Sequence, residues 1–286
     1  MSQIDPDYEV IIQPNRSWFY VDWKGLLHYS DLLFLLVRRD FVARYKQTIL
    51  GPLWFIIQPI FTTVVFTIVF AKVAKISTDE LPPMLFYLCA LVPWGYFSGS
   101  LEATSKSLLA NAGLFNKVYF PRLIIPLSIV VSNLIALAIQ LATFLGFYFY
   151  YKFLTPAGST INPNLLIFVL PLFLLQTAAV ALGFGLWVSA LTVKYRDFQN
   201  LMAFIIPLWM YATPIIYPTS TVPEKWRVFL ALNPMAGIVD SFRYAFFGSG
   251  YINVSHILIS VAGTVLVLVS GMLIFNKVER TFVDWI

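Results

Sequence analysis

The sequence predicts an all-α integral membrane protein with about six transmembrane helices. Of its 286 residues, 59% are hydrophobic and only 12% are charged, whereas an ordinary globular domain is about one quarter charged. The hydrophobic residues are gathered into long runs without Asp, Glu, Lys or Arg, and a helix of roughly 20 such residues crosses the hydrocarbon core of a bilayer. The runs that are long enough extend over 53–71, 84–101, 123–151, 165–193, 198–223 and 256–276.

The lengths of these runs indicate how each helix would cross the bilayer. The second run crosses only if its helix stands nearly upright, whereas the third and fourth runs are longer than the hydrocarbon core and must tilt or project into water. The fifth run contains Pro207, Pro214 and Pro218. Because proline removes a hydrogen-bond donor and clashes with the preceding turn, we expect the last part of the fifth run to be broken.

Residues 30–49, which precede the first run, predict an amphipathic helix that lies in the cytoplasmic membrane interface. Ser30 or Asp31 can cap its start. Apolar and aromatic side chains recur on one side at helical spacing, at Phe34, Val37, Phe41 and Tyr45. The basic side chains of the helix are Arg38, Arg39, Arg44 and Lys46. A water-soluble helix packed on a partner protein is the alternative, and Gly51-Pro52 would supply the bend into the membrane.

The distribution of basic residues predicts that both termini are cytoplasmic. With six spans the termini share one side, and that side carries thirteen of the 19 Lys and Arg residues. Cytoplasmic connections of membrane proteins carry such an excess, which also explains the net charge of +5 without a nucleic-acid partner. We therefore expect a cytoplasmic tail over residues 1–29 and a transmembrane domain over residues 30–286.

Two connections between the runs are amphipathic rather than simply polar. The connection 217–255 lies on the outer side and is rich in aromatic residues such as Trp226, Phe242 and Phe247, which predicts short helices that dip into the outer leaflet. The connection 105–122 lies on the inner side.

The sequence lacks the motifs of several enzyme classes. It contains no G-x-x-x-x-G-K-[ST] loop for nucleotide phosphates, so work driven by ATP must come from another chain. The single cysteine, Cys89, falls in an apolar run and is expected in the core, and His28 and His256 are far apart. Asp5 and Asp7 match a D-x-D pattern, but two carboxylates in a polar tail are more often solvated. We expect no catalytic residue, no metal site and no cofactor in this chain.

Few polar side chains occur within the runs. Ion-coupled transporters place ionisable groups at membrane depth, and only Glu102 approaches that description, at the inner end of a run. An ion-coupled mechanism is therefore poorly supported. The other polar side chains are Gln58, Ser132, Asn133 and Gln140, and we expect the Asn and Gln side chains among them to bond between helices.

Three segments carry unusual sequence patterns. The first begins with Arg38-Arg39-Asp40, continues as Arg44-Tyr45-Lys46-Gln47-Thr48 to Leu53-Trp54 and runs to Gln58-Pro59. The second is Asn116-Lys117-Val118-Tyr119-Phe120-Pro121-Arg122, and the third is Tyr195-Arg196-Asp197. Together with Leu232-Asn233-Pro234 and Phe242-Arg243-Tyr244, these segments resemble the ABC-2-type permeases that export O-antigen, capsular polysaccharide or teichoic acid. The resemblance runs from about residue 25 to the end of the sequence.

The resemblance implies a set of partners. Such permeases act as homodimers that dock on two copies of a cytoplasmic ATP-binding subunit, which holds the ATP and Mg²⁺. The connection around Ser105–Arg122 would be the coupling helix that contacts this subunit, and residues 30–49 would be the family's interface helix. The implied contact residues are Asn116, Lys117, Tyr119, Phe120, Arg122, Arg196 and Asp197, of which the last two would either touch the subunit or close the inner mouth. The alternative is that Lys117, Arg122 and Arg196 only bind lipid headgroups.

The resemblance also implies an export channel lined by the first, second and fifth spans. Aromatic rings present a smooth surface to the C–H faces of sugar rings, and Tyr and Trp can hydrogen-bond sugar hydroxyls. The alternative is that these rings face lipid or neighbouring helices. The aromatic candidates in the three spans are Trp54, Phe55, Phe61, Phe66, Tyr87, Trp94, Tyr96, Phe97, Trp209, Tyr211 and Tyr217.

The hypothesis from sequence is therefore a permease for ATP-driven export of an undecaprenyl-diphosphate-linked polysaccharide across a bacterial inner membrane. O-antigen is the favoured polysaccharide. Capsular polysaccharide and teichoic acid are alternatives within the same family, and a permease for drugs or small lipids is a third. An ion-coupled transporter and a membrane glycosyltransferase are the alternatives from other classes.

Overall fold

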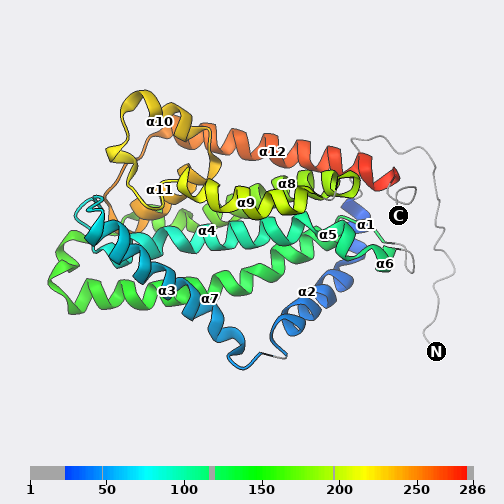
Figure 1. Cartoon of the computed structure of the whole chain (residues 1–286), viewed down its shortest axis with the longest axis horizontal. Helices are drawn as coiled ribbons and strands as arrows, with labels where there is room; N and C mark the ends of the chain where they lie inside the picture. The colour runs from blue at the N-terminus through cyan, green and yellow to red at the C-terminus, as the bar shows by residue number, and fades with distance from the viewer. Residues whose placement is uncertain (1–22, 47, 116–119, 196, 282–286) are drawn as a thin grey trace.

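The computed structural model describes residues 23–46, 48–115, 120–195 and 197–281. Within these ranges the chain is helical and contains no strand, so the all-α prediction is confirmed. The helices form an elongated bundle in which α4, α7, α8 and α12 run along the long axis (Figure 1). Their bounds are Pro83–Ser105 for α4, Ile124–Leu154 for α7, Leu170–Lys194 for α8 and Val254–Thr281 for α12.

Five helices of the described chain are long and apolar enough to cross a membrane. They are α4, α7, α8 with the preceding 3-10 turn Leu165–Val169, α12, and the helix α3 (Trp54–Phe66), which continues as the π-helical segment Thr67–Val73. At 1.5 Å per residue, the 31 residues of α7 extend about 46 Å, which exceeds the hydrocarbon core as expected.

The helix in the fifth predicted run is shorter than the other long helices, because the run is broken. Helix α9 spans Phe198–Tyr211, which is 14 residues and too short to cross a bilayer without further chain. Pro207 lies inside α9, and the helix ends three residues before Pro214. The predicted break is confirmed, and the chain after Tyr211 continues to Pro223 as turns and one short 3-10 helix, Thr219–Thr221.

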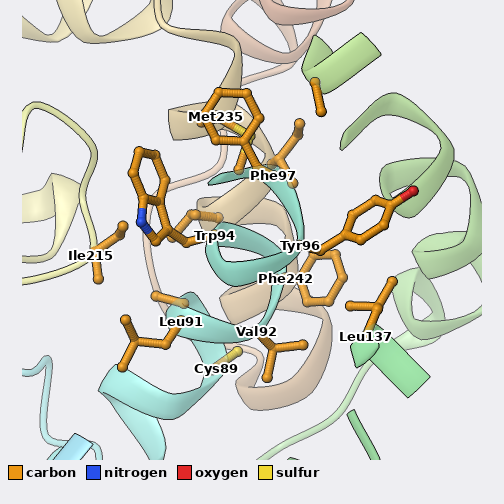
Figure 2. Packing of buried hydrophobic residues seen from close by; sticks show 14 of the residues in the cluster. Cys89, Leu91, Val92, Trp94, Tyr96, Phe97, Leu137, Ile215, Met235 and Phe242 are labelled. Carbon is orange, nitrogen blue, oxygen red and sulfur yellow. The ribbon is translucent and has the colours of Figure 1, made fainter. Parts of the chain in front are cut away.

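Helix α4 forms the centre of the core. It packs against α3, α7, α8, α9 and the short helix α11 (Pro234–Phe247), and its side chains from Leu85 to Trp94 are buried. Figure 2 shows Trp94 and Phe97 of α4 in one cluster with Met235 and Phe242 of α11. Cys89 is 1% exposed, so its predicted place in the core is confirmed.

Glycines let three long helices approach closely. A methyl group added at Gly183 of α8 would lie 2.8 Å from the backbone of Leu268 in α12, and one added at Gly271 of α12 would collide with the carbonyl oxygen of Gly183. On the other side of α8, a methyl group at Gly185 would lie 2.6 Å from Thr104 of α4. Small residues at helix crossings are how membrane helices gain packing where lipid offers no hydrophobic driving force.

Polar side chains join the long helices, as the sequence predicted for Asn133. The Asn133 amide of α7 donates to Ser100 Oγ of α4 at 3.2 Å. Gln176 Nε2 of α8 donates to the hydroxyls of Ser260 and Thr264 on α12, at 2.8 and 3.2 Å. Gln58 differs, because its side chain lies on the exposed surface of α3.

Short helices form the connection between α9 and α12, as predicted. Helix α10 spans Glu224–Ala231, and α11 packs against α4, α8 and α12 at the same end of the bundle (Figure 1). We call this the outer end. The inner end holds α1 (Trp23–His28), α5 (Ser107–Ala110), α6 (Ala112–Phe115) and the last turns of α12.

The helix predicted over 30–49 is α2, which spans Ser30–Tyr45 and packs against α7. Its buried contact is made by Leu36, which is 2% exposed, whereas Phe34 on the predicted apolar side is 66% exposed. The helix therefore has two apolar sides. One packs within the chain, and the other is available to lipid or to a partner.

Candidate functional sites at the two ends of the bundle

The inner connection after α4 is fixed to the bundle by hydrogen bonds. Ser107, the first residue of α5, shares a hydrogen bond of 3.0 Å with Ser189 of α8, and the Ser189 hydroxyl also accepts from the backbone N–H of Leu108. The Asn111 amide donates back to the carbonyl oxygen of Ser107 at 2.9 Å. Because both serines are buried, the start of this connection is held against α8.

The end of the inner connection is buried under α2. Phe120 is 4% exposed and packs with Leu36, Ile124 and Ile125. Its ring also lies 5.7 Å from the ring of Phe115 at the end of α6. Of the residues implied as contacts for an ATP-binding subunit, Phe120 is thus enclosed within the chain.

Arg122 is joined to the last turn of α12. Its guanidinium donates through Nη1 to the backbone carbonyl oxygen of Glu279, and its backbone N–H donates to Glu279 Oε1 at 3.4 Å. The guanidinium carbon also lies 5.3 Å from the centre of the Phe115 ring. A cation is favourable at the C-terminal end of a helix, where carbonyl groups lack partners within the helix.

The remaining implied contacts divide into described and undescribed residues. Asp197 is exposed at the start of α9. On α2, Arg38 and Arg39 are exposed, and Arg39 pairs with its neighbour Asp40 at 2.8 Å. Lys46 is also exposed. The candidates outside the described residues are Asn116, Lys117, Tyr119 and Arg196, together with the side chains of Arg44 and Tyr45.

The aromatic channel candidates separate into three groups by exposure. Those on the surface are Trp54, Phe61 and Tyr211, which are 48%, 68% and 53% exposed. Those of intermediate exposure are Phe55, Trp209 and Tyr217. Those buried in the core of this chain, at 9% exposure or less, are Phe66, Tyr87, Trp94, Tyr96 and Phe97.

Asn233 connects the end of α9 to the start of α11. Its side-chain oxygen accepts from the Trp209 indole N–H at 3.0 Å and caps α11 by accepting from the backbone N–H of Met235. Its amide donates to Thr213 Oγ1 at 2.9 Å and to the carbonyl oxygen of Ala212. One side chain thus satisfies groups on both sides of the break after α9.

Arg243 of α11 is buried at the outer end, at 4% exposure. Its guanidinium donates to the carbonyl oxygens of Pro214, Ile215 and Tyr217, at 2.7 Å for Ile215. Its charge lies 3.6 Å from the centre of the Phe86 ring of α4. The arginine therefore supplies hydrogen-bond donors to backbone carbonyl groups in the turns after α9, where the helical hydrogen-bond pattern has ended.

Carboxylates complete this outer cluster. Asp240, one turn before Arg243 on α11, accepts a hydrogen bond of 2.7 Å from Thr219 Oγ1. Asp79 accepts from the neighbouring Ser220 hydroxyl at 2.8 and 3.0 Å. Asp79 itself has a positive φ of 51°, which is uncommon outside glycine and best tolerated by Asp and Asn. The segment 213–221 is thus held by charged residues from α11 and from the connection before α4.

The carboxyl group of Asp240 is protonated more readily than usual. Burial raises its pKa to about 7, against the lowering effects of Arg243 and of the hydrogen bond from Thr219, while Asp79 raises it further. Asp240 also lines a small cavity of about 20 Å³ with His256, Tyr251 and other residues, which is enough for a water molecule.

We predict that Asp240→Asn stabilises the chain at pH 8 and weakens the dependence of stability on pH. Because the folded pKa is raised from 3.8 to about 7, the stability contributed by Asp240 is complete below about pH 4 and is lost as the pH rises through about 7. Asparagine keeps an oxygen that can accept from Thr219. Melting temperatures in detergent between pH 5 and pH 8 measure this, with His256→Gln as the control that keeps the carboxyl group. Parallel curves for Asp240→Asn and the unmodified chain would refute the prediction.

Sequence patterns did not point to the pairing partners at either end. No sequence pattern marks Glu279 or Asp240 as the partner of an arginine. For Arg243 the sequence does carry a signal, because a single arginine between aromatic residues in an apolar stretch is unusual. Among the described residues, no group of three His, Cys, Asp or Glu side chains is arranged to hold a metal ion.

Comparisons with known proteins identify similar chains. The model of the ABC-2 type transporter family matches residues 31–247. The O-antigen export system permease protein RfbA of Klebsiella pneumoniae is 29% identical over 254 residues, which cover 89% of this chain and 94% of that protein. The RfbA protein of Myxococcus xanthus is 28% identical, with 91% and 97% covered, and the polysialic acid transport protein KpsM of Escherichia coli is 23% identical, with 78% and 82% covered.

Proposed function

The chain belongs to the ABC-2 type transporter family, and from this we propose that it is the membrane-spanning permease of a polysaccharide exporter in a bacterial inner membrane. The observation that carries the proposal is the similarity to O-antigen export permeases over 89% and 91% of the chain. The helices long enough to span a membrane agree with that role. Members of this family are transmembrane components, so we expect no catalysis by the chain alone.

The energy for export comes from a separate ATP-binding subunit. The sequence contains no phosphate-binding loop of the G-x-x-x-x-G-K-[ST] type, so ATP and Mg²⁺ are assigned to the partner. We propose that the partner docks at the inner end, against the connection that includes α5 and α6. Both termini then lie in the cytoplasm, in keeping with the excess of basic residues on that side.

The cargo is proposed to be an O-antigen chain linked to undecaprenyl diphosphate. A capsular polysaccharide is the second candidate, because a polysialic acid transport protein is also similar to this chain. The identity of 29% to an O-antigen permease against 23% to that protein favours the first candidate.

The channel is proposed to form between two copies of the chain. In the most apolar 18-residue stretch of the α3 span, only 11% of the residues are buried, against 78% in that of α4. The α3 span therefore faces either lipid or a second copy of the chain. In a homodimer, the exposed rings of Trp54, Phe61 and Tyr211 would line the path of the glycan. The buried rings of Tyr96 and Phe97 would support that wall from behind.

Reconstitution tests the proposed function. We expect proteoliposomes that contain the chain and its ATP-binding subunit to translocate an undecaprenyl-diphosphate-linked glycan when ATP is supplied, and to continue after a protonophore has collapsed the proton gradient. Vesicles with the chain alone are the control and should translocate nothing. Transport driven by the proton gradient would support an ion-coupled transporter instead, and consumption of an activated sugar by the purified chain would support a glycosyltransferase.

A further inference from the structure

The inner connection and the end of α12 are fastened to each other by two reciprocal bonds. The side chain of Arg122 binds the main chain of Glu279, and the side chain of Glu279 binds the main chain of Arg122. The two residues lie 157 positions apart in the sequence. Each bond involves a charged group, which strengthens a hydrogen bond, and the one from the Arg122 N–H to Glu279 Oε1 is the long one of the two at 3.4 Å.

The same joint is anchored on a third side. Phe115 lies under the Arg122 guanidinium and against Phe120, whose ring is buried with Leu36 of α2. A displacement of the inner connection therefore acts on α2 through apolar packing and on α12 through hydrogen bonds.

Helix α12 extends from this joint to the outer end. Its backbone touches that of α8 at Gly271, and near its start the Ser260 hydroxyl donates to the carbonyl oxygen of Pro234, the first residue of α11, at 2.9 Å. The 28 residues of α12 span about 42 Å at 1.5 Å per residue. One continuous helix thus links the inner connection to the helix that carries the outer cluster.

We propose that Arg122 is a positioning residue, which with Glu279 transmits displacement of the inner connection to α12, and not a direct contact for the ATP-binding subunit. The proposal rests on the proposed function, because that subunit supplies the displacement. It assigns to Arg122 a partner inside the chain and leaves the contact with the subunit to other residues of the inner end.

Matched variants of the two residues distinguish a positioning role from a direct contact. In the complex with the ATP-binding subunit we expect Arg122→Ala and Glu279→Ala each to retain the subunit and to lower the glycan exported per ATP hydrolysed, by about tenfold for the loss of one charge-assisted hydrogen bond. Each variant removes one of the two reciprocal bonds, and because both bonds join the same two residues, the double variant should lose less than the sum of the two single losses. Lys24→Ala, which removes an exposed basic residue at the inner end, is the control and should behave as the unmodified complex.

Two outcomes would overturn the proposal. If Arg122→Ala released the ATP-binding subunit while Glu279→Ala exported normally, Arg122 would be a direct contact. If Glu279→Ala left export per ATP unchanged, the joint would have no part in coupling.

Hydrogen exchange measures the joint without the partner and so separates it from the proposed function. In the chain alone, we expect Glu279→Ala to speed exchange at the backbone N–H of residue 122, which loses its acceptor, and Arg122→Ala to speed exchange in the last turns of α12, which lose a donor. Unchanged exchange would overturn the joint itself. If instead the unmodified chain bound no ATP-binding subunit while exchange responded as expected, the proposed function would fail and the joint would stand.

Discussion

Replacing Gly271 with alanine is expected to lower the melting temperature of the purified chain by about 5–10 °C. The added methyl group would collide with the carbonyl oxygen of Gly183 and lie 3.1 Å from its Cα atom. These are backbone atoms inside α8, so the collision cannot be relieved by rotating a side chain, and α8 and α12 must move apart. Overpacking of this kind costs about 1–3 kcal/mol, which corresponds to several degrees for a chain of this size.

Gly263→Ala is the matched control for this variant. Gly263 lies two turns earlier on the same helix, and a methyl group there would meet only the Pro234 side chain at an ordinary distance of 3.6 Å. The control should therefore melt at or slightly above the temperature of the unmodified chain, because alanine favours helix over glycine. Melting followed by intrinsic fluorescence in detergent measures both variants. Equal melting temperatures for the two would show that α8 and α12 do not cross at Gly183 and Gly271.

The helical type of the long apolar runs could be predicted because bilayer thickness constrains local sequence, whereas six spanning runs were expected and five helices of the described chain are long enough to cross. An uncharged run of about 20 residues has few alternatives to a spanning helix, since every backbone group must be satisfied internally in lipid. Proline acts equally locally, which is why the break after α9 could be predicted from Pro207 and Pro214. The helical nature of the connection between α9 and α12 followed from its aromatic content in the same way.

Burial could not be predicted from the same patterns. The α3 and α4 spans are both apolar, yet 11% of the residues in the most apolar stretch of α3 are buried and 78% of those in the stretch of α4. In a soluble protein apolar side chains mark the core, but in a membrane protein they face lipid equally well, so hydropathy does not separate the two environments. For this reason the aromatic candidates divided into exposed residues such as Phe61 and buried ones such as Tyr87.

The partners of the isolated charged residues were also beyond local reasoning. The cluster at the outer end pairs Arg243 with carbonyl groups 26 to 29 positions earlier, and the inner joint pairs residues 157 positions apart. Nothing in the spacing of residues along one helix specifies such pairings, which depend on how helices meet in space. What the sequence does show is that Arg243 stands among apolar and aromatic residues, with Asp240 one helical turn before it.

Replacing Arg243 with methionine is expected to destabilise the chain by about 3–5 kcal/mol. The guanidinium is 4% exposed, binds the carbonyl oxygens of Pro214 and Ile215, and lies 3.6 Å from the centre of the Phe86 ring. Methionine fills much of the same volume but leaves those carbonyl groups buried without donors, and it removes the positive charge that lowers the pKa of Asp240. Removing one partner of a buried polar network costs more than the net contribution of its bonds, since the remaining groups keep their desolvation penalty.

Two further variants identify which part of that loss is due to the carbonyl groups. Asp240→Asn added to Arg243→Met removes the carboxylate left without its arginine. Any stability regained by this double variant therefore measures the effect of the charge alone. We expect the regained stability to be less than half of the loss, because the carbonyl groups of Pro214 and Ile215 remain unpaired.

Arg227→Met is the matched control, because Arg227 also donates to two carbonyl oxygens, of Val222 and Ser220, but is more exposed than Arg243. Its loss should cost about 1 kcal/mol, since water can replace its donors. Unfolding measured by denaturant titration in detergent ranks the variants. A full recovery in the double variant would show that Arg243 is retained to balance Asp240, and that the turns after α9 hold their conformation without it.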